Sequence, residues 1–151
     1  MGDASVPLNS ESLTIQEASK RSGLSEPTLR YYESIGLITA VPRDKSSGHR
    51  RYSPSTMEII EVLSNLRTVG MSIDDMHTYL RLRERGDEAA AERKALFEAH
   101  AVELSAEIRR LESRQRYLAA KIAYWDAIMR QDSAAAQEIA DNFQQIVAEL
   151  T

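Results

Sequence analysis

The chain of 151 residues contains no cysteine. This absence excludes a disulfide framework and any metal or iron–sulfur site that depends on thiolates. No apolar run approaches the roughly 20 residues that a membrane-spanning helix needs. The first residues, MGDASVPLNSES, lack the basic start and apolar core of a signal peptide, so we expect a disordered tail over residues 1–12 and a cytoplasmic protein.

Glycine and proline are absent from the last part of the chain. All six glycines and all four prolines lie within residues 1–86. Because these residues make turns and interrupt helices, we expect a compact, turn-rich domain followed by an almost wholly helical region. The predicted fold is mainly α, with a small turn-rich domain over 13–86, a long helix over 87–130 and a C-terminal helix over 131–151.

Two short helices joined by a tight turn are predicted between Thr14 and Gly36. Thr14 and Glu17 have the spacing of a capping box, and Gly23 ends the first helix. Ser25 is a typical N-cap for the second helix. The size of the pair favours a helix-turn-helix whose second helix lies in the DNA major groove. That helix carries Thr28, Arg30, Tyr31 and Tyr32.

A basic hairpin is predicted directly behind the two helices. Arg43 to Tyr52 reads as strand, turn and strand, with the turn at Asp44–Gly48 and a return strand that carries Arg50 and Arg51. Residues 14–54 hold seven basic and four acidic side chains, a net charge of +3, whereas the whole chain has a charge of −4. Such local basicity in an acidic chain indicates phosphate binding rather than an ordinary charged surface.

Three runs, TLRYYESIGLI, PRDKSSGHRRYS and LRTVGMSIDDM, occur in this order over residues 13–85. Together they resemble the N-terminal signature of the MerR transcriptional regulators. The resemblance implies a winged-helix domain with Arg30 and Tyr31 on the recognition helix, a first wing around His49, and Arg67 near a second wing at the helix pair around Gly70. The expected DNA-contacting residues are Thr14, Ser25, Thr28, Arg30, Tyr31, Tyr32, Arg43, His49, Arg50, Arg51, Tyr52 and Arg67.

Two further helices are predicted behind the hairpin. Ser53 caps the first, and Ser72 with Asp75 forms a capping box for the second. Gly86 then closes the domain. Their apolar stripes are expected to build the small core and carry no chemistry: Ile59, Leu63, Leu66, Ile73, Met76 and Leu80.

From Glu88 to about Met129 apolar residues recur with the alternating spacing of a coiled coil, over more than four heptads. A helix of 40 residues is about 60 Å long and cannot bury such a seam alone, so a partner helix is required. We interpret Gln115 in an a position as a register device. The heptads leave the strand direction open, and the family resemblance implies an antiparallel homodimer. The expected dimer residues are Phe97, Leu104, Ile108, Leu111, Gln115, Leu118 and Ile122.

A last helix is predicted from Ser133 to Leu150, capped by Asp132, most simply covering the end of the coiled coil. In the MerR family this region forms the effector site, and the aromatic candidates for an effector here are Tyr117, Tyr124, Trp125 and Phe143. The alternative is that these aromatics only pack the dimer. His49, His77 and His100 show no metal-ligand spacing, and we expect no cofactor or metal.

Three classes of function compete. The first is a homodimeric regulator on a palindromic promoter site. The resemblance implies that such a dimer distorts promoter DNA for RNA polymerase, and a small organic molecule is the candidate effector. The second is a coiled-coil protein-interaction module, which the net acidity would fit. The third is an enzyme. The sequence shows no nucleophile–base pair and no phosphate loop that would support this class. Activation or repression, the operator and the effector stay open.

Overall fold

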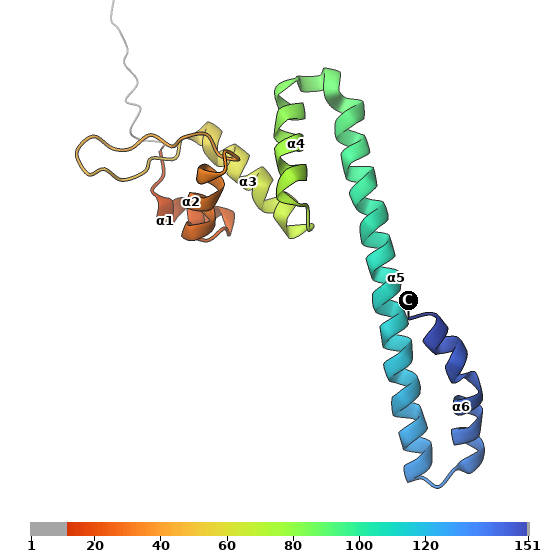
Figure 1. Ribbon diagram of the computed structural model, residues 1–151. Helices are drawn as coiled ribbons and strands as arrows, with labels where there is room; N and C mark the ends of the chain where they lie inside the picture. The colour runs from red at the N-terminus through yellow and green to blue at the C-terminus, as the bar shows by residue number, and fades with distance from the viewer. Residues whose placement is uncertain (1–11, 151) are drawn as a thin grey trace, which may run out of the picture. The chain divides into compact units, whose positions relative to one another are not determined.

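The computed structural model describes residues 12–150, so the tail predicted over residues 1–12 lies outside the described part except for Ser12. The chain divides into two compact units, the first ending at Arg93 and the second starting at Lys94 (Figure 1). Within residues 12–150, none of the helices combines the length and the apolar character required to cross a bilayer.

The first two helices begin at the predicted caps. In α1 (Ile15–Ser22) the Thr14 hydroxyl accepts a hydrogen bond from Glu17 N at 3.2 Å, and Thr14 N donates to Glu17 Oε1 at 3.2 Å. Gly23 ends α1 with φ of 76°, a left-handed conformation that glycine adopts without steric cost. In α2 (Glu26–Ser34) the Ser25 hydroxyl accepts from Thr28 N at 3.2 Å. The helix-turn-helix therefore follows from local capping chemistry.

Two longer helices complete the first unit. α3 (Pro54–Thr68) is capped by Ser53, and α4 (Ile73–Glu84) is capped by Ser72. A 3-10 turn, η1 (Gly86–Ala89), leads into the long helix. The core of this unit is apolar and buried. Its fully buried large side chains are Leu29, Ile38, Tyr52, Met57, Ile60, Leu63 and Met76.

The predicted strand–turn–strand is present only as a loop with isolated bridges, because no regular strand forms among residues 12–150. Arg43 and Arg50 form one antiparallel bridge, and Tyr52 forms another with Leu13. The ladder is short because the return segment changes its partner. Arg51 N still donates to Pro42 O at 2.8 Å, whereas Tyr52 N donates to Leu13 O at 2.8 Å. The return segment thus ties the loop to the start of α1.

The second unit is a helical hairpin of α5 (Ala90–Met129), which begins in the first unit, and α6 (Ser133–Ala148). Gln131 turns the chain with φ of 57°, and Asp132 caps α6 by accepting from Ala135 N at 3.1 Å. α6 runs back alongside α5, with Arg116 Nε 3.0 Å from Glu149 Oε2. α6 therefore packs along the side of α5, over the last part of the predicted coiled coil, where Ser113 and Ala127 are buried.

α6 covers the face of α5 opposite the heptad seam. Ser113 and Ala127 are buried, and the Tyr117 ring lies 5.2 Å from that of Phe143. By the predicted heptads these three α5 residues occupy c and f positions. The seam stays open: its side chains are 41–81% exposed at Phe97, Leu104, Ile108, Leu111, Leu118, Ile122, Trp125 and Met129. One chain thus leaves unburied the apolar surface that the heptads predict for a partner.

Candidate nucleic-acid interface

The second helix of the helix-turn-helix has one buried and one open face. Leu29 and Tyr32 are buried against the core, at 0% and 3% exposure. The next residue along from Leu29, Arg30, is exposed, and Tyr31 is 53% exposed. The buried side chains anchor the helix on one side, and the other side presents a guanidinium and a phenol. Such a helix can enter a DNA groove without unfolding.

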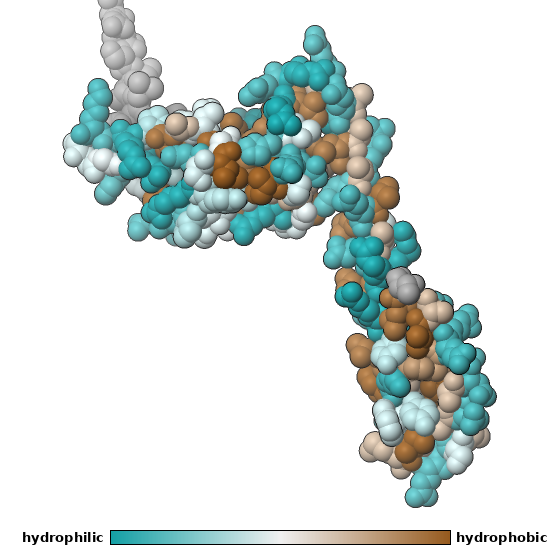
Figure 2. Space-filling model, viewed as in Figure 1, coloured by the Kyte–Doolittle hydropathy of each residue, from teal (hydrophilic) through white to brown (hydrophobic). Residues whose placement is uncertain are grey.

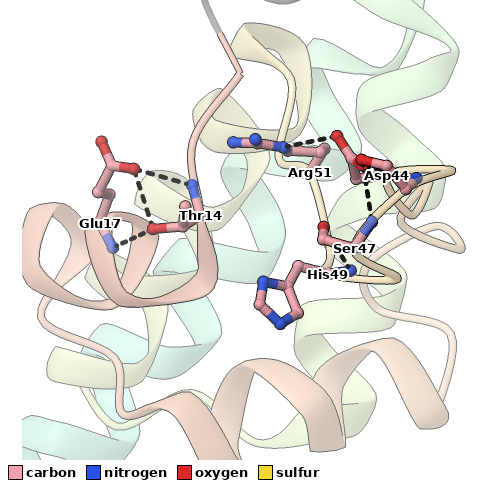
Figure 3. A network of polar contacts seen from close by, with 7 residues as sticks. Thr14, Glu17, Asp44, Ser47, His49 and Arg51 are labelled. Atoms are coloured by element: carbon pink, nitrogen blue, oxygen red, sulfur yellow. Dashed lines mark hydrogen bonds and ion pairs between the residues drawn. The ribbon is translucent and has the colours of Figure 1, made fainter.

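The turn of the hairpin is organised by one carboxylate. Asp44 Oδ1 accepts hydrogen bonds from Ser46 N at 2.8 Å, Ser46 Oγ at 2.6 Å and Ser47 N at 3.0 Å. The Ser46 hydroxyl and then these two amides hold the pKa of the Asp44 carboxyl well below its usual range. The other oxygen, Oδ2, faces Arg51 at 3.8 Å, and His49 projects from the same loop (Figure 3). The loop therefore presents its basic side chains from a fixed turn.

Two arginine contacts hold the hairpin in place. Arg43 Nη1 donates to Gly48 O at 3.2 Å, across the base of the turn. Arg50 Nε lies 3.2 Å from Glu33 Oε2 on α2, with about a fifth of each side chain exposed. Glu33 was absent from the residues selected from the sequence, because its pairing over 17 positions depends on the tertiary fold.

A cavity of about 360 Å³ lies where the hairpin, α1 and α2 meet. The N-terminus of α1 opens onto it, and helix N-termini carry a partial positive charge. Two guanidiniums and an imidazole beside one carboxylate make this surface suited to an anion such as a phosphate, whereas the guanidinium of Arg50 is already paired with Glu33. Its lining residues are Thr14, Ile15, Gln16, Glu26, Arg30, Arg43, Gly48, His49 and Arg50.

α3 also contributes a basic side chain, Arg67, to the region of the helix-turn-helix. Arg67 Nη1 donates to Thr28 Oγ1 at 3.2 Å. Arg67 also lines a cavity of about 390 Å³ with Ser25 and Thr68, at the turn between α1 and α2. The predicted residues Ser25, Thr28 and Arg67 are therefore neighbours, close to the turn that ends α3.

Two of the predicted DNA contacts lie inside the core. Tyr32 is 3% exposed, and Tyr52 is fully buried with a hydroxyl that has no hydrogen-bond partner among residues 12–150. Burial raises the pKa of the Tyr52 phenol. A side chain buried to this extent cannot reach DNA, so the expectation that Tyr32 and Tyr52 contact DNA is corrected: they support α2 and the hairpin from within.

The predicted effector residues separate into two groups in the second unit. Tyr117, Tyr124 and Phe143 lie between α5 and α6. Trp125 is 59% exposed on the seam, although its ring meets that of Tyr124 at 5.3 Å. Lys121, which lies among the aromatics of the first group, was missed because a lysine in a heptad pattern is usually solvated. No group of three metal-ligating side chains occurs over the described residues 12–150.

Known proteins similar to this chain are DNA-binding regulators. The family model described as "MerR HTH family regulatory protein" matches residues 13–82, and the one described as "MerR, DNA binding" matches residues 58–121. The HTH-type transcriptional regulator HmrR of Rhizobium leguminosarum bv. viciae is 32% identical over 129 residues, which cover 85% of this chain and 98% of the relative.

Solved structures give the same result. A crystal structure of HiNmlR, described as a MerR family regulator lacking the sensor domain, bound to promoter DNA, superposes with a TM-score of 0.64 at 26% identity. The match covers 85% of this chain and 95% of that one. A MerR family regulator described as putative, from Listeria monocytogenes, superposes with a TM-score of 0.64 at 33% identity, over 88% and 97% of the two chains.

Proposed function

The chain belongs to the MerR family of DNA-binding transcriptional regulators, and on this premise we propose that it acts as a homodimer on a palindromic promoter site. The similar proteins are regulators and not enzymes, and we propose no catalytic role. The work of the protein is then to recognise DNA at the nucleoid and to change how RNA polymerase uses a promoter.

The basic cavity at the junction of hairpin, α1 and α2 is the observation that carries this proposal. Arg30 and Tyr31 on the open face of α2 enter the major groove, and Arg43 and His49 hold the flanking phosphates. Arg50 and Arg51 keep the hairpin oriented through their carboxylate partners. Thr14, Ser25, Thr28 and Arg67 contribute further contacts near the two helix N-termini.

Dimerisation supplies the second half-site. Burial of the open α5 seam against a second copy removes apolar side chains from water, which is favourable at about 25 cal/mol per Å². Two copies related by a two-fold axis recognise inverted half-sites. Phosphate contacts made on both sides of the dyad provide the energy to twist the intervening promoter DNA, the step that makes it usable by polymerase.

The two α5 helices run antiparallel in this proposal. When the two-fold axis passes at the level of Ser113, Leu104 lies opposite the partner's Ile122. The a positions of one helix then meet the d positions of the other along the whole seam. In this arrangement the two copies of Leu104 lie about 27 Å apart, whereas in a parallel pair they are adjacent. Because the chain lacks cysteine, the variants L104C and I122C report the direction cleanly.

A disulfide needs Cα atoms within about 7 Å. We expect oxidation to link the mixed pair L104C with I122C and to leave each variant alone unlinked. Covalent dimers of L104C alone would overturn the antiparallel arrangement.

Selection from a random duplex library with the full chain tests the proposed function. We expect enrichment of an inverted repeat, and binding that weakens steeply as salt rises, since phosphate contacts release counterions. The alternative, a protein-interaction module, predicts no enriched sequence and no steep salt dependence, and that result would overturn the proposal.

A further inference from the structure

A small cavity of about 240 Å³ opens between α5 and α6 in the second unit. Lys121 and Tyr124 line it from α5, and Ile139, Ala140 and Phe143 line it from α6. Figure 2 shows apolar and weakly polar side chains gathered on this face of the unit. Sites for drug-sized ligands are usually about 300–1,000 Å³, so this cavity suits a smaller molecule.

Lys121 gives the cavity its charge. Its Nζ lies 4.3 Å from the Phe143 ring centroid and 5.9 Å from that of Tyr117. Contacts with ring faces stabilise the ammonium but satisfy its N–H donors poorly. No carboxylate among residues 12–150 forms an ion pair with Lys121, whereas Arg116 on the same helix is paired with Glu149. A half-buried cation without an anionic partner therefore faces an apolar wall.

We propose that this cavity binds a small apolar monocarboxylate, such as an arylalkanoate, as the effector of the regulator. The carboxylate accepts hydrogen bonds from Lys121 Nζ and from the Tyr124 hydroxyl, which lies one turn further along α5. The apolar body packs against Ile139, Ala140 and Phe143. Charge-assisted hydrogen bonds at one end and an apolar wall at the other distinguish such an acid from its neutral analogues.

A direct contact connects this cavity with the dimer seam. The ring of Tyr124 meets the ring of Trp125 edge-on, at 5.3 Å and 78°. Trp125 lies on the open seam, in a d position. A ligand that shifts Tyr124 therefore shifts a side chain that the dimer buries. This regulatory part of the inference rests on the proposed function, since it requires that the dimer bind DNA.

Binding of 3-phenylpropanoate to the full chain, measured by calorimetry and by the fluorescence of Trp125, tests the site. Trp125 is the only tryptophan, so the signal comes from one place. We expect the carboxylate to bind at least tenfold more tightly than the neutral 3-phenylpropanamide. Equal affinities, or no binding of either compound, would overturn the assignment.

Lys121→Met removes the charge and keeps an unbranched apolar stem, and Lys121→Gln is a second variant if the first folds poorly. Either should abolish the preference for the acid while DNA affinity without ligand is unchanged. Lys94→Met is the matched control, because Lys94 lies on the same helix and pairs with Glu98. A preference retained in both Lys121 variants would overturn the site.

The DNA titration separates the two proposals. If the wild-type chain binds no duplex but still prefers the acid, the proposed function fails and the site stands. If the chain binds its operator and the acid leaves both operator affinity and DNA twist unchanged, the effector role is overturned, because a ligand with equal affinity for two states shifts neither.

Discussion

Arg50 on the hairpin donates to Glu33 on α2 at 3.2 Å, and this ion pair joins the two elements that we propose to contact DNA. Each side chain is about one-fifth exposed, so the pair is better shielded than the open ion pairs elsewhere on the chain. Arg50 was expected from the sequence to be a phosphate contact. From this geometry we propose that Arg50 is first a positioning residue, which fixes where the exposed arginine and histidine of the hairpin lie.

Glu33→Gln tests this positioning role. Removal of a negative charge beside DNA should by electrostatics alone strengthen binding. If the ion pair orients the hairpin, the variant should instead bind its operator several-fold more weakly, because an amide holds the Arg50 guanidinium less well. Titration of a labelled duplex measures the sign directly. Glu61→Gln, which breaks the exposed pair of Glu61 with Arg21, is the control and should have a smaller effect.

Arg43→Ala tests a phosphate contact. Arg43 is exposed at the basic cavity, and one of its nitrogens holds Gly48 O while the others are free to meet DNA. We expect the variant to weaken specific and non-specific binding alike and to lower the salt slope by about one unit. The measurement is affinity across a salt series, with Lys94→Ala as control. An unchanged slope would remove Arg43 from the interface.

Arg30→Ala tests base recognition. Arg30 lies on the open face of α2, next to the exposed Tyr31. If its guanidinium reads a base edge, the variant should lose about 1–3 kcal/mol of discrimination between the operator and a mismatched site. Equal weakening at both sites would instead show that Arg30 contacts only phosphate.

Much of the fold could be predicted from the sequence because its signals are local. Thr14, Ser25, Ser53, Ser72 and Asp132 each bond a backbone amide within three residues, so spacing alone places the helix starts. The long α5 likewise follows from the absence of glycine and proline after residue 86.

Features that depend on distant residues could not be predicted in this way. Tyr32 and Tyr52 are aromatic residues among basic ones, as DNA-contacting residues often are. Only the packed core shows that they are buried. The hairpin was expected to continue as paired strands, yet Tyr52 pairs with Leu13, some forty positions earlier. The heptad pattern also carries no information on which face of α5 receives α6, and so the aromatics of that face were grouped with Trp125.

Leu118→Lys tests dimerisation. Leu118 is 59% exposed on the seam of a single chain. In the dimer the lysine would be a buried, unpaired charge, which is costly, so we expect a monomer at micromolar concentration and loss of operator binding. Val102→Lys is the control, since Val102 is 69% exposed but lies off the seam. Sedimentation of both variants is the measurement, and a Leu118→Lys chain that stays dimeric would show that the heptads are wrongly assigned.

We propose that two copies of this chain read inverted half-sites through α2 and the hairpin. Hydroxyl-radical footprinting of the full chain on the inverted repeat selected from the duplex library tests it most directly. We predict two protected patches related by a dyad, with their centres about 34 Å or a multiple apart along the helix axis. A single patch without symmetry, or protection that survives in Leu118→Lys at the same concentration, would contradict the account.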